Sequence, residues 1–143
     1  MKSFKNLSIL ILSLVFFCSF SLKYSPSYVG KWKGDDKGDV GYLTLSEDNY
    51  ATFEFNGEIM GGKSFDHKGT SASMKYTVDT SYNPYRIDFI IIDNGNEDEL
   101  GRLKGIVKMI ESNKMRLALG FGESERPTDF SEENSIYFDR HKE

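Results

Sequence analysis

The residues that most resemble a known chemical motif are residues 57–64, Gly-Glu-Ile-Met-Gly-Gly-Lys-Ser, which fit the phosphate-loop pattern. In a phosphate loop a helix starts at the lysine, and the N–H groups at its N-terminus bind the phosphates. The residues that follow here, 65–70, contain Gly69 and show no helical periodicity. We therefore interpret residues 57–64 as a glycine-rich hairpin connection and not as a nucleotide site.

Two groups of residues could bind a metal ion. Residues 93–99, Asp-Asn-Gly-Asn-Glu-Asp-Glu, are rich in oxygen ligands for Ca²⁺, but the glycine that an EF-hand needs at its sixth position is missing. The only two histidines, His67 and His141, are far apart and lack metal-ligand spacing. We interpret residues 93–99 as a solvated hairpin tip and His67 as a surface residue. No metal and no cofactor is predicted.

Residues for nucleophilic catalysis are equally sparse. The chain has no Gly-x-Ser-x-Gly elbow, and its single cysteine, Cys18, lies near the N-terminus. Asp88 is a carboxylate within a predicted strand, but alternation with Ile87 and Phe89 turns it away from the core, toward the side of Arg86 and Ile90. No catalytic residue is assigned, and an enzyme remains the third alternative for function.

The N-terminus has the pattern of an export signal. Lys2 and Lys5 precede an apolar and serine-containing run over residues 7–22, and small residues at 19 and 21 suit cleavage after Ser21. The alternative interpretation is an uncleaved transmembrane anchor. The run is shorter than the roughly 20 residues that a membrane-spanning helix needs. We predict a signal helix over residues 1–21 and a single domain over residues 22–143, periplasmic or secreted.

Cys18 leaves a lipid anchor as the alternative, although the preceding residue, Phe17, is bulkier than acylation requires. Cleavage after Ser21 would remove the only cysteine, so the mature domain would contain no disulfide. It would also remove Lys2 and Lys5 and make the formal net charge of −4 more negative. An acidic surface argues against nucleic acid and anionic membranes as partners. We expect a monomer with no membrane span after signal cleavage.

The rest of the chain shows the two-residue periodicity of half-buried strands. Eight short apolar-alternating segments, separated by turn residues, predict an all-β domain, a single antiparallel up-and-down β-barrel. The alternative fold is a β-sandwich, because folding over into two packed sheets also protects the edges of such a sheet. The Asn-Gly pairs at residues 56–57 and 94–95 predict tight turns with positive φ. Residues 122–133, which are polar and contain Pro127, predict a surface loop before the last strand.

The two ends of this domain resemble the calycin superfamily of lipocalins and fatty-acid-binding proteins. Gly30 and Trp32 form a Gly-x-Trp motif at the start of the first strand, and Arg140 ends the last strand. The resemblance implies that Trp32 packs across the closed end of the barrel beneath Arg140, with Gly30 permitting close backbone approach. A guanidinium over an indole gains cation–π attraction. The implied role of these three residues is a structural barrel plug.

Residues 126–130, Arg-Pro-Thr-Asp-Phe, are similar to a segment of an uncharacterised family of exported bacterial lipocalin-like domains, for which no activity is implied. The chain departs from the better-known relatives in two respects. It lacks the helix that ends true lipocalins, and only residues 35–39 separate the first two strands, where fatty-acid-binding proteins insert lid helices. We therefore expect a narrow barrel, largely filled by its own Phe, Met and Leu side chains.

The leading functional hypothesis is non-catalytic binding of a small apolar or amphipathic ligand in the barrel mouth. It rests on six inward-facing aromatic residues that would line the ligand site or simply form the core: Phe53, Phe55, Tyr76, Phe89, Phe121 and Phe138. The alternative is a protein-interaction module with a filled barrel, an inhibitor or envelope-assembly factor that contacts its partner through the loop at residues 122–133.

Overall fold

The computed structural model describes residues 27–121 and 125–142, and all the regular structure in these ranges is β-strand. The predicted signal helix, its cleavage site and Cys18 lie outside the described residues. The strands are β1 (Gly30–Asp36), β2 (Asp39–Leu45), β3 (Ala51–Phe55), β4 (Glu58–Gly61), β5 (Phe65–His67), β6 (Thr70–Asp79), β7 (Tyr85–Asp93), β8 (Glu99–Glu111), β9 (Lys114–Gly120) and β10 (Ser135–Arg140).

These strands form one antiparallel sheet in the order β4-β3-β2-β1-β10-β9-β8-β7-β6-β5. The prediction of an all-β antiparallel barrel is confirmed at this level, but the prediction of about eight strands is wrong, because there are ten. The two additional strands are β4 and β5. Both are short, with four and three residues, so neither contains enough alternation to be recognised from its sequence.

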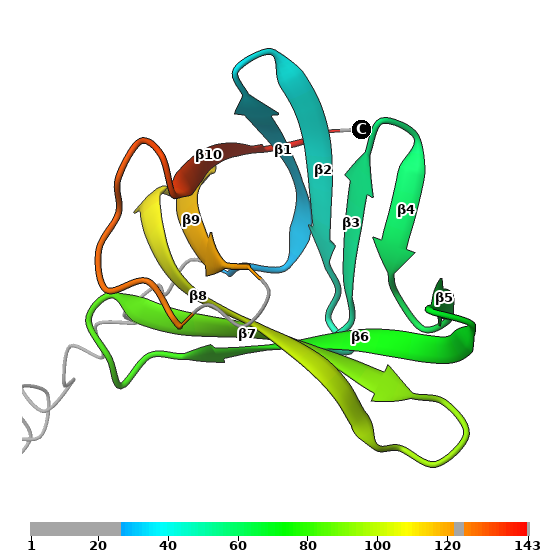
Figure 1. Ribbon diagram of the computed structural model, residues 1–143. Helices are drawn as coiled ribbons and strands as arrows, with labels where there is room; N and C mark the ends of the chain where they lie inside the picture. Colours follow the sequence, from blue (N-terminus) through cyan, green and yellow to red (C-terminus); the bar gives the residue numbers. More distant parts are fainter. Residues whose placement is uncertain (1–26, 122–124, 143) are drawn as a thin grey trace, which may run out of the picture.

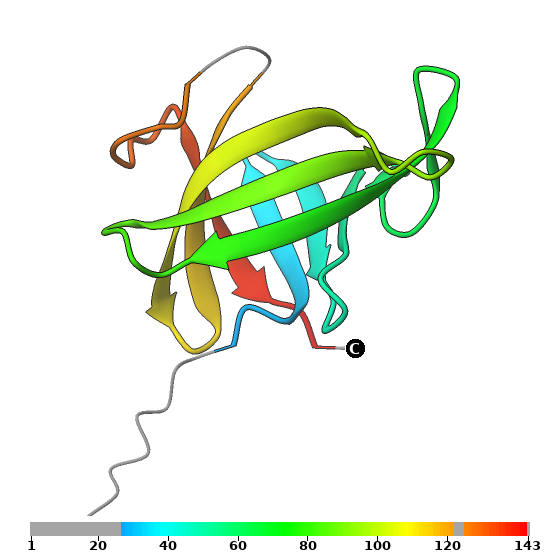
Figure 2. The ribbon, with the colours of Figure 1, turned by 90° about the horizontal axis from the view of Figure 1, so that it is seen from below.

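The sheet curls into a nearly closed barrel (Figures 1 and 2). The two edges of the sheet approach one another and close the barrel where β3 and the residue after β4 meet β6. The amide of Gly62 donates to the carbonyl of Ala51 at 2.7 Å, and the carbonyl of Gly62 accepts from the amide of Met74 at 2.9 Å. An isolated bridge also joins Tyr50 to Lys75. This seam is held by far fewer bonds than the other strand junctions, whose ladders run over several residues.

Three hairpin turns have positive φ at both central residues, which gives them the twist that tight hairpins require. They are Lys37–Gly38 between β1 and β2, Asn56–Gly57 between β3 and β4, and Lys68–Gly69 between β5 and β6. The prediction for Asn56–Gly57 is therefore confirmed. The corresponding prediction for residues 94–95 is wrong, because the positive φ in the β7–β8 connection falls on Glu97.

The core consists of the inward side chains of the alternating strands, which confirms the two-residue periodicity. The largest fully buried side chains are Trp32, Phe89, Phe138, Leu43, Leu45, Met74, Ile87, Met115 and Val107. Two residues depart from the predicted pattern at the ends of their strands. Phe55 is 40% exposed, and Phe121, which follows the end of β9, is 68% exposed.

Within the connection between β9 and β10, which is predicted to be a surface loop, the described residues contact the barrel wall. The described part of this connection, residues 125–134, which we call the outer loop, passes outside β8 and β9 (Figure 1). A guanidinium nitrogen of Arg126 donates to the carbonyl of Gly105 at 2.8 Å, and the guanidinium of Arg116 lies 5.3 Å from the ring centre of Phe130. The outward-facing Ile106 and Ala118 are buried in the same part of the sheet. The outer loop is thus packed on the wall of the barrel.

The described ranges contain no helix with the length and apolarity that crossing a membrane requires.

Candidate functional site

One end of the barrel is closed by Arg140 and Trp32, which are paired across β1 and β10. The guanidinium carbon lies 4.2 Å from the centre of the indole ring, and Trp32 is fully buried. Arg140 also donates to the carbonyls of Ser27, Val29 and Ser112, at 2.8, 2.8 and 3.1 Å. One side chain thus ties the segment before β1 to the β8–β9 turn and covers the indole.

Gly30 lies against this guanidinium. A Cβ atom at this position would be 2.8 Å from a terminal nitrogen of Arg140, and the φ of Gly30 is +140°, a conformation that L-residues rarely adopt. A side chain at position 30 would therefore both displace Arg140 and strain the backbone.

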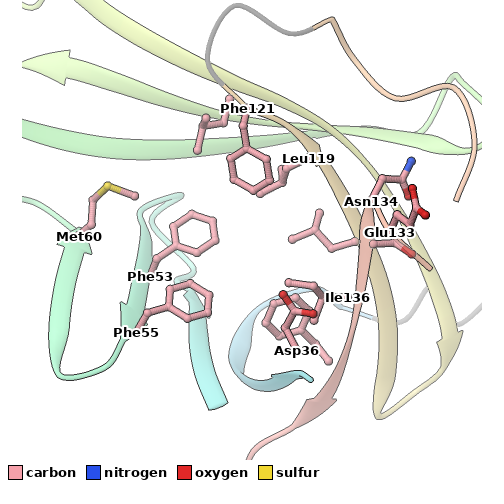
Figure 3. A pocket seen from close by; sticks show the side chains of 13 residues that line it. Asp36, Phe53, Phe55, Met60, Leu119, Phe121, Glu133, Asn134 and Ile136 are labelled. Carbon is pink, nitrogen blue, oxygen red and sulfur yellow. The ribbon is translucent and has the colours of Figure 1, made fainter. Parts of the chain in front are cut away.

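The opposite end of the barrel contains a cavity of about 310 Å³. It lies between the end of β1, the end of β3, β4, the first half of β8, the end of β9 and the start of β10 (Figure 3). Most of its wall is apolar and is formed by Phe53, Phe55, Met60, Leu103, Leu117, Leu119, Phe121, Ile136 and Phe138. A concave apolar site of this size is at the lower end of the roughly 300–1,000 Å³ range of small-molecule pockets.

Glycines in the neighbouring strands give the aromatic rings of this wall their positions. A Cβ atom on Gly34 would be 2.7 Å from the ring of Phe138, and a Cβ atom on Gly41 would overlap the ring of Phe55. Each ring therefore occupies the space that a side chain in the neighbouring strand would fill.

Four polar residues complete the cavity lining: Asp36, Glu133, Asn134 and Ser135. In Figure 3, Glu133 and Asn134 lie across the cavity from Phe55 and Met60. No lysine or arginine is among the described residues that line the cavity. The site is therefore amphipathic, with an apolar wall on one side and an acidic, hydrogen-bonding margin on the other.

The six aromatic residues predicted to line a ligand site separate into two groups. Phe53, Phe55, Phe121 and Phe138 line the cavity. Phe53 and Phe138 also belong to the core, whereas the other two, Phe89 and Tyr76, lie in the core and do not line the cavity. Phe89 is fully buried and packs edge-on against Phe53, with ring centres 4.9 Å apart. Tyr76 donates its hydroxyl hydrogen to the carbonyl of Ser46 at 2.9 Å, and burial, followed by the nearby charge of Asp48, raises its pKa.

The outer loop is tied to the barrel wall by an ion-pair network centred on Asp88. One carboxylate oxygen accepts from Arg126 at 2.6 Å and the other from Arg102 at 2.9 Å. The side chain of Asp88 is only 13% exposed. Burial is the largest single influence on the pKa of Asp88, and it raises that pKa. The hydrogen bonds and charges of Arg126 and Arg102 lower the pKa by more than burial raises it, so the net shift is downward.

The segment that matches a phosphate loop folds as strand and bend. Its lysine, Lys63, follows β4, is not followed by a helix, and pairs with the carboxylate of Asp48 at 3.1 Å. Among the residues that the structure describes, no group of three or more His, Cys, Asp or Glu side chains has the geometry of a metal site. His67 and His141 lie apart and contact the rings of Phe65 and Tyr42, respectively.

A larger hollow, of about 810 Å³, lies toward the closed end, between the segment before β1, the β6–β7 connection and the end of β8. Its lining includes Tyr28, Tyr85, Met109 and Phe130. It is bounded on one side by Ser27, where the described part of the chain begins.

Several residues of the cavity were not among the predicted site residues. Leu117 and Leu119 alternate with Arg116 and Ala118 in the sequence, so alternation predicts their inward orientation, although it does not distinguish a cavity wall from a filled core. Asp36 and Glu133 carry no such signal. They reach the same cavity because β1 pairs with β10, which brings residues far apart in the chain to one end of the barrel.

No family model, no curated protein and no solved structure matches this chain. The resemblance to lipocalins therefore rests on the motifs and on the antiparallel barrel alone.

Proposed function

We propose that this chain is an exported, lipocalin-like, non-catalytic binding protein that takes up a small apolar or amphipathic ligand at the open end of its barrel. The observation that carries the proposal is the apolar cavity of about 310 Å³ at that end. The closed end is covered by Trp32 and Arg140, so the ligand would enter and leave by the mouth. The expected dissociation constants of small apolar probes are about 10 µM to 1 mM, as is usual for ligands of this size.

Filling the cavity tests this proposal. N-phenyl-1-naphthylamine is an uncharged dye whose fluorescence rises when it leaves water, and we expect the wild-type protein to bind it. Leu119 lines the cavity and is half-buried, so Leu119→Trp places an indole in the space that the dye needs. The expected result is a loss of affinity of at least about tenfold, which corresponds to about 1.4 kcal/mol.

The matched control is Ile110→Trp. Ile110 lies near the other end of β8, is 42% exposed and does not line the cavity. We expect it to leave dye binding within about twofold of wild type. Equal dye binding by wild type and Leu119→Trp would contradict the proposal, and so would a wild-type protein that binds no dye. Native mass spectrometry of protein purified from its own host would identify a natural ligand.

The alternative of a protein-interaction module is not favoured by a specific observation. Its predicted contact surface was the loop at residues 122–133, and the described part of that loop is held against the barrel by Arg126 and Phe130.

A further inference from the structure

We propose that the mouth of the barrel selects amphipathic ligands with a cationic head group, an ammonium or amine on an apolar chain, over those with an anionic head group. This inference rests on the proposed function, because it concerns the ligand class of the same cavity. It is carried by the charges at the cavity margin, which are all of one sign.

The two carboxylates at the margin come from different parts of the chain. Asp36 ends β1, and Glu133 lies in the outer loop just before β10. Both are exposed, and neither forms an ion pair with another described residue, whereas Asp48, Asp88, Glu99 and Asp139 do. Their charges are therefore available to a bound ligand.

The neutral polar groups of the margin suit the same ligand. Asn134 and Ser135 line the cavity beside Glu133. The side-chain oxygen of Asn134 already accepts from the amide of Ser131 at 2.7 Å, and the hydroxyl oxygen of Ser135 accepts from Arg116 at 2.9 Å, so each oxygen has one further lone pair for an amine. The nearest lysine in sequence, Lys37, follows Asp36 in the β1–β2 turn but does not line the cavity. A ligand carboxylate at this mouth would thus face two like charges with no described cation in the lining to offset them.

The cavity volume limits the apolar part of the ligand. About 310 Å³ equals roughly ten water molecules at about 30 Å³ each, which suits an alkyl chain of about eight to ten carbon atoms. With the chain against the wall of Phe53, Phe55 and Leu119, a head group at its end reaches the margin where Asp36 and Glu133 lie. The apolar wall supplies affinity for any such chain, and the two carboxylates set the preference among head groups.

The experiment compares three ligands that share a decyl chain: decyltrimethylammonium, decanol and decanoate. Their dissociation constants are measured by calorimetry with the full-length mature protein, below the critical micelle concentrations of the two charged ligands and below the solubility limit of decanol. An exposed ion pair changes affinity by up to about fivefold, so we expect decyltrimethylammonium to bind about tenfold more tightly than decanoate, with decanol between them. Raising the salt concentration narrows this ratio, because exposed charges are screened.

The variants act on the margin alone. In the double variant Asp36→Asn, Glu133→Gln the ratio falls to about twofold or less, while decanol binding is unchanged. In Asp36→Lys, Glu133→Lys the order of the charged ligands reverses. The matched control is Glu111→Gln, which removes one exposed carboxylate at the closed end and keeps the wild-type ratio. Thermal melts of each variant check that the fold is retained.

The outcomes separate the two proposals. If the three ligands bind equally, or decanoate binds best, the head-group preference is overturned and the binding function stands. If the wild-type protein binds none of them, both proposals fail. A preference that survives in the double variant also overturns the inference, because the two carboxylates would then not be its source.

Discussion

The two ends of this barrel are built on the same pair of strands but in opposite ways. At the closed end, β1 and β10 bring together Trp32 and Arg140, and the guanidinium satisfies the carbonyls of three other residues. At the open end the same strands contribute Asp36 and Ile136 to the margin of a cavity. The closed end therefore stabilises the barrel, whereas the open end keeps the cavity in which we propose that a ligand binds. Each variant below tests one side of this difference, in order of decreasing effect.

The largest effect is expected for Trp32→Ala. Trp32 is fully buried and covered by Arg140, so its removal leaves a large cavity and an uncovered guanidinium. The free energy of unfolding should fall by about 3–5 kcal/mol, the usual cost of removing a buried Trp or Phe side chain. Urea unfolding followed by far-UV circular dichroism measures it, since Trp32 is the only tryptophan. A loss below about 1 kcal/mol would contradict a stabilising closed end.

The next effect is expected for Gly30→Ala. The new methyl group would meet Arg140 and would have to adopt a φ near +140°, so we expect a loss of about 2–3 kcal/mol. Gly38→Ala is the matched control, because Gly38 has a φ of +97° with no atom within 4 Å of a new Cβ. It should cost about 1 kcal/mol, from backbone strain alone. Equal losses in the two variants would show that contact with Arg140 is unimportant.

An intermediate loss of stability is expected for Asp88→Asn, at the ion pairs that hold the outer loop against the barrel wall. Asp88→Asn weakens the bonds to Arg126 and Arg102 and should cost about 1–3 kcal/mol at pH 7. Because the pKa of Asp88 is lowered in the folded state, its stabilising contribution is present above the unfolded value, near 3.8, and is lost as the pH falls through the lowered value. The difference between wild type and Asp88→Asn should therefore shrink between pH 5 and pH 2.

The closed end provides the comparison for this pH dependence. Arg140 donates hydrogen bonds to backbone carbonyls, which do not titrate. The loss in the free energy of unfolding caused by Arg140→Met should therefore be the same at pH 5 and pH 3. Urea unfolding of both variants over this pH range measures the difference. A constant cost for Asp88→Asn, or a falling cost for Arg140→Met, would contradict the assignment.

The smallest effect on stability is expected for Phe121→Ala. Phe121 is 68% exposed, so the free energy of unfolding should change by no more than about 0.5 kcal/mol. Because Phe121 lines the cavity, the same change should weaken binding of decanol severalfold. Calorimetry and urea unfolding on one sample test both statements. A large loss of stability would show that the open end, too, is mainly structural.

The sequence predicted most of the sheet because alternation is a local property. Met74 and Tyr76, like Ile87 and Phe89, are two residues apart and are buried together in the structure. The prediction failed where an element was too short for a period to show, as in β4 and β5. It also placed Phe121 in a strand, although β9 ends one residue earlier, at Gly120.

The candidate site was predicted only in part, because its polar half is created by tertiary structure. Phe53 and Phe138 follow from alternation, whereas Asp36 and Glu133 meet only through the β1–β10 pairing. The sequence motif that contains Arg126 indicates no contact for this residue, since its partner Asp88 lies 38 positions away in the chain. Asp88 lies on the outer face as predicted, but the sequence contains no sign that Arg126 covers it.

The position of the first and last strands within the sheet has a consequence for the order of assembly. β1 and β10 are neighbours near the middle of the sheet, while its edges, β4 and β5, come from the middle of the chain. A nascent chain can form the hairpins of β1 to β4 and β6 to β9 separately, but the ladder that joins β1 to β9 through β10 cannot form until β10 has left the ribosome. Because pairing strands so distant in sequence is slow, the β1–β10 pairing is expected to form last. Until then the two halves of the sheet can contact one another only through the few bonds of the seam between β3, the residue after β4, and β6.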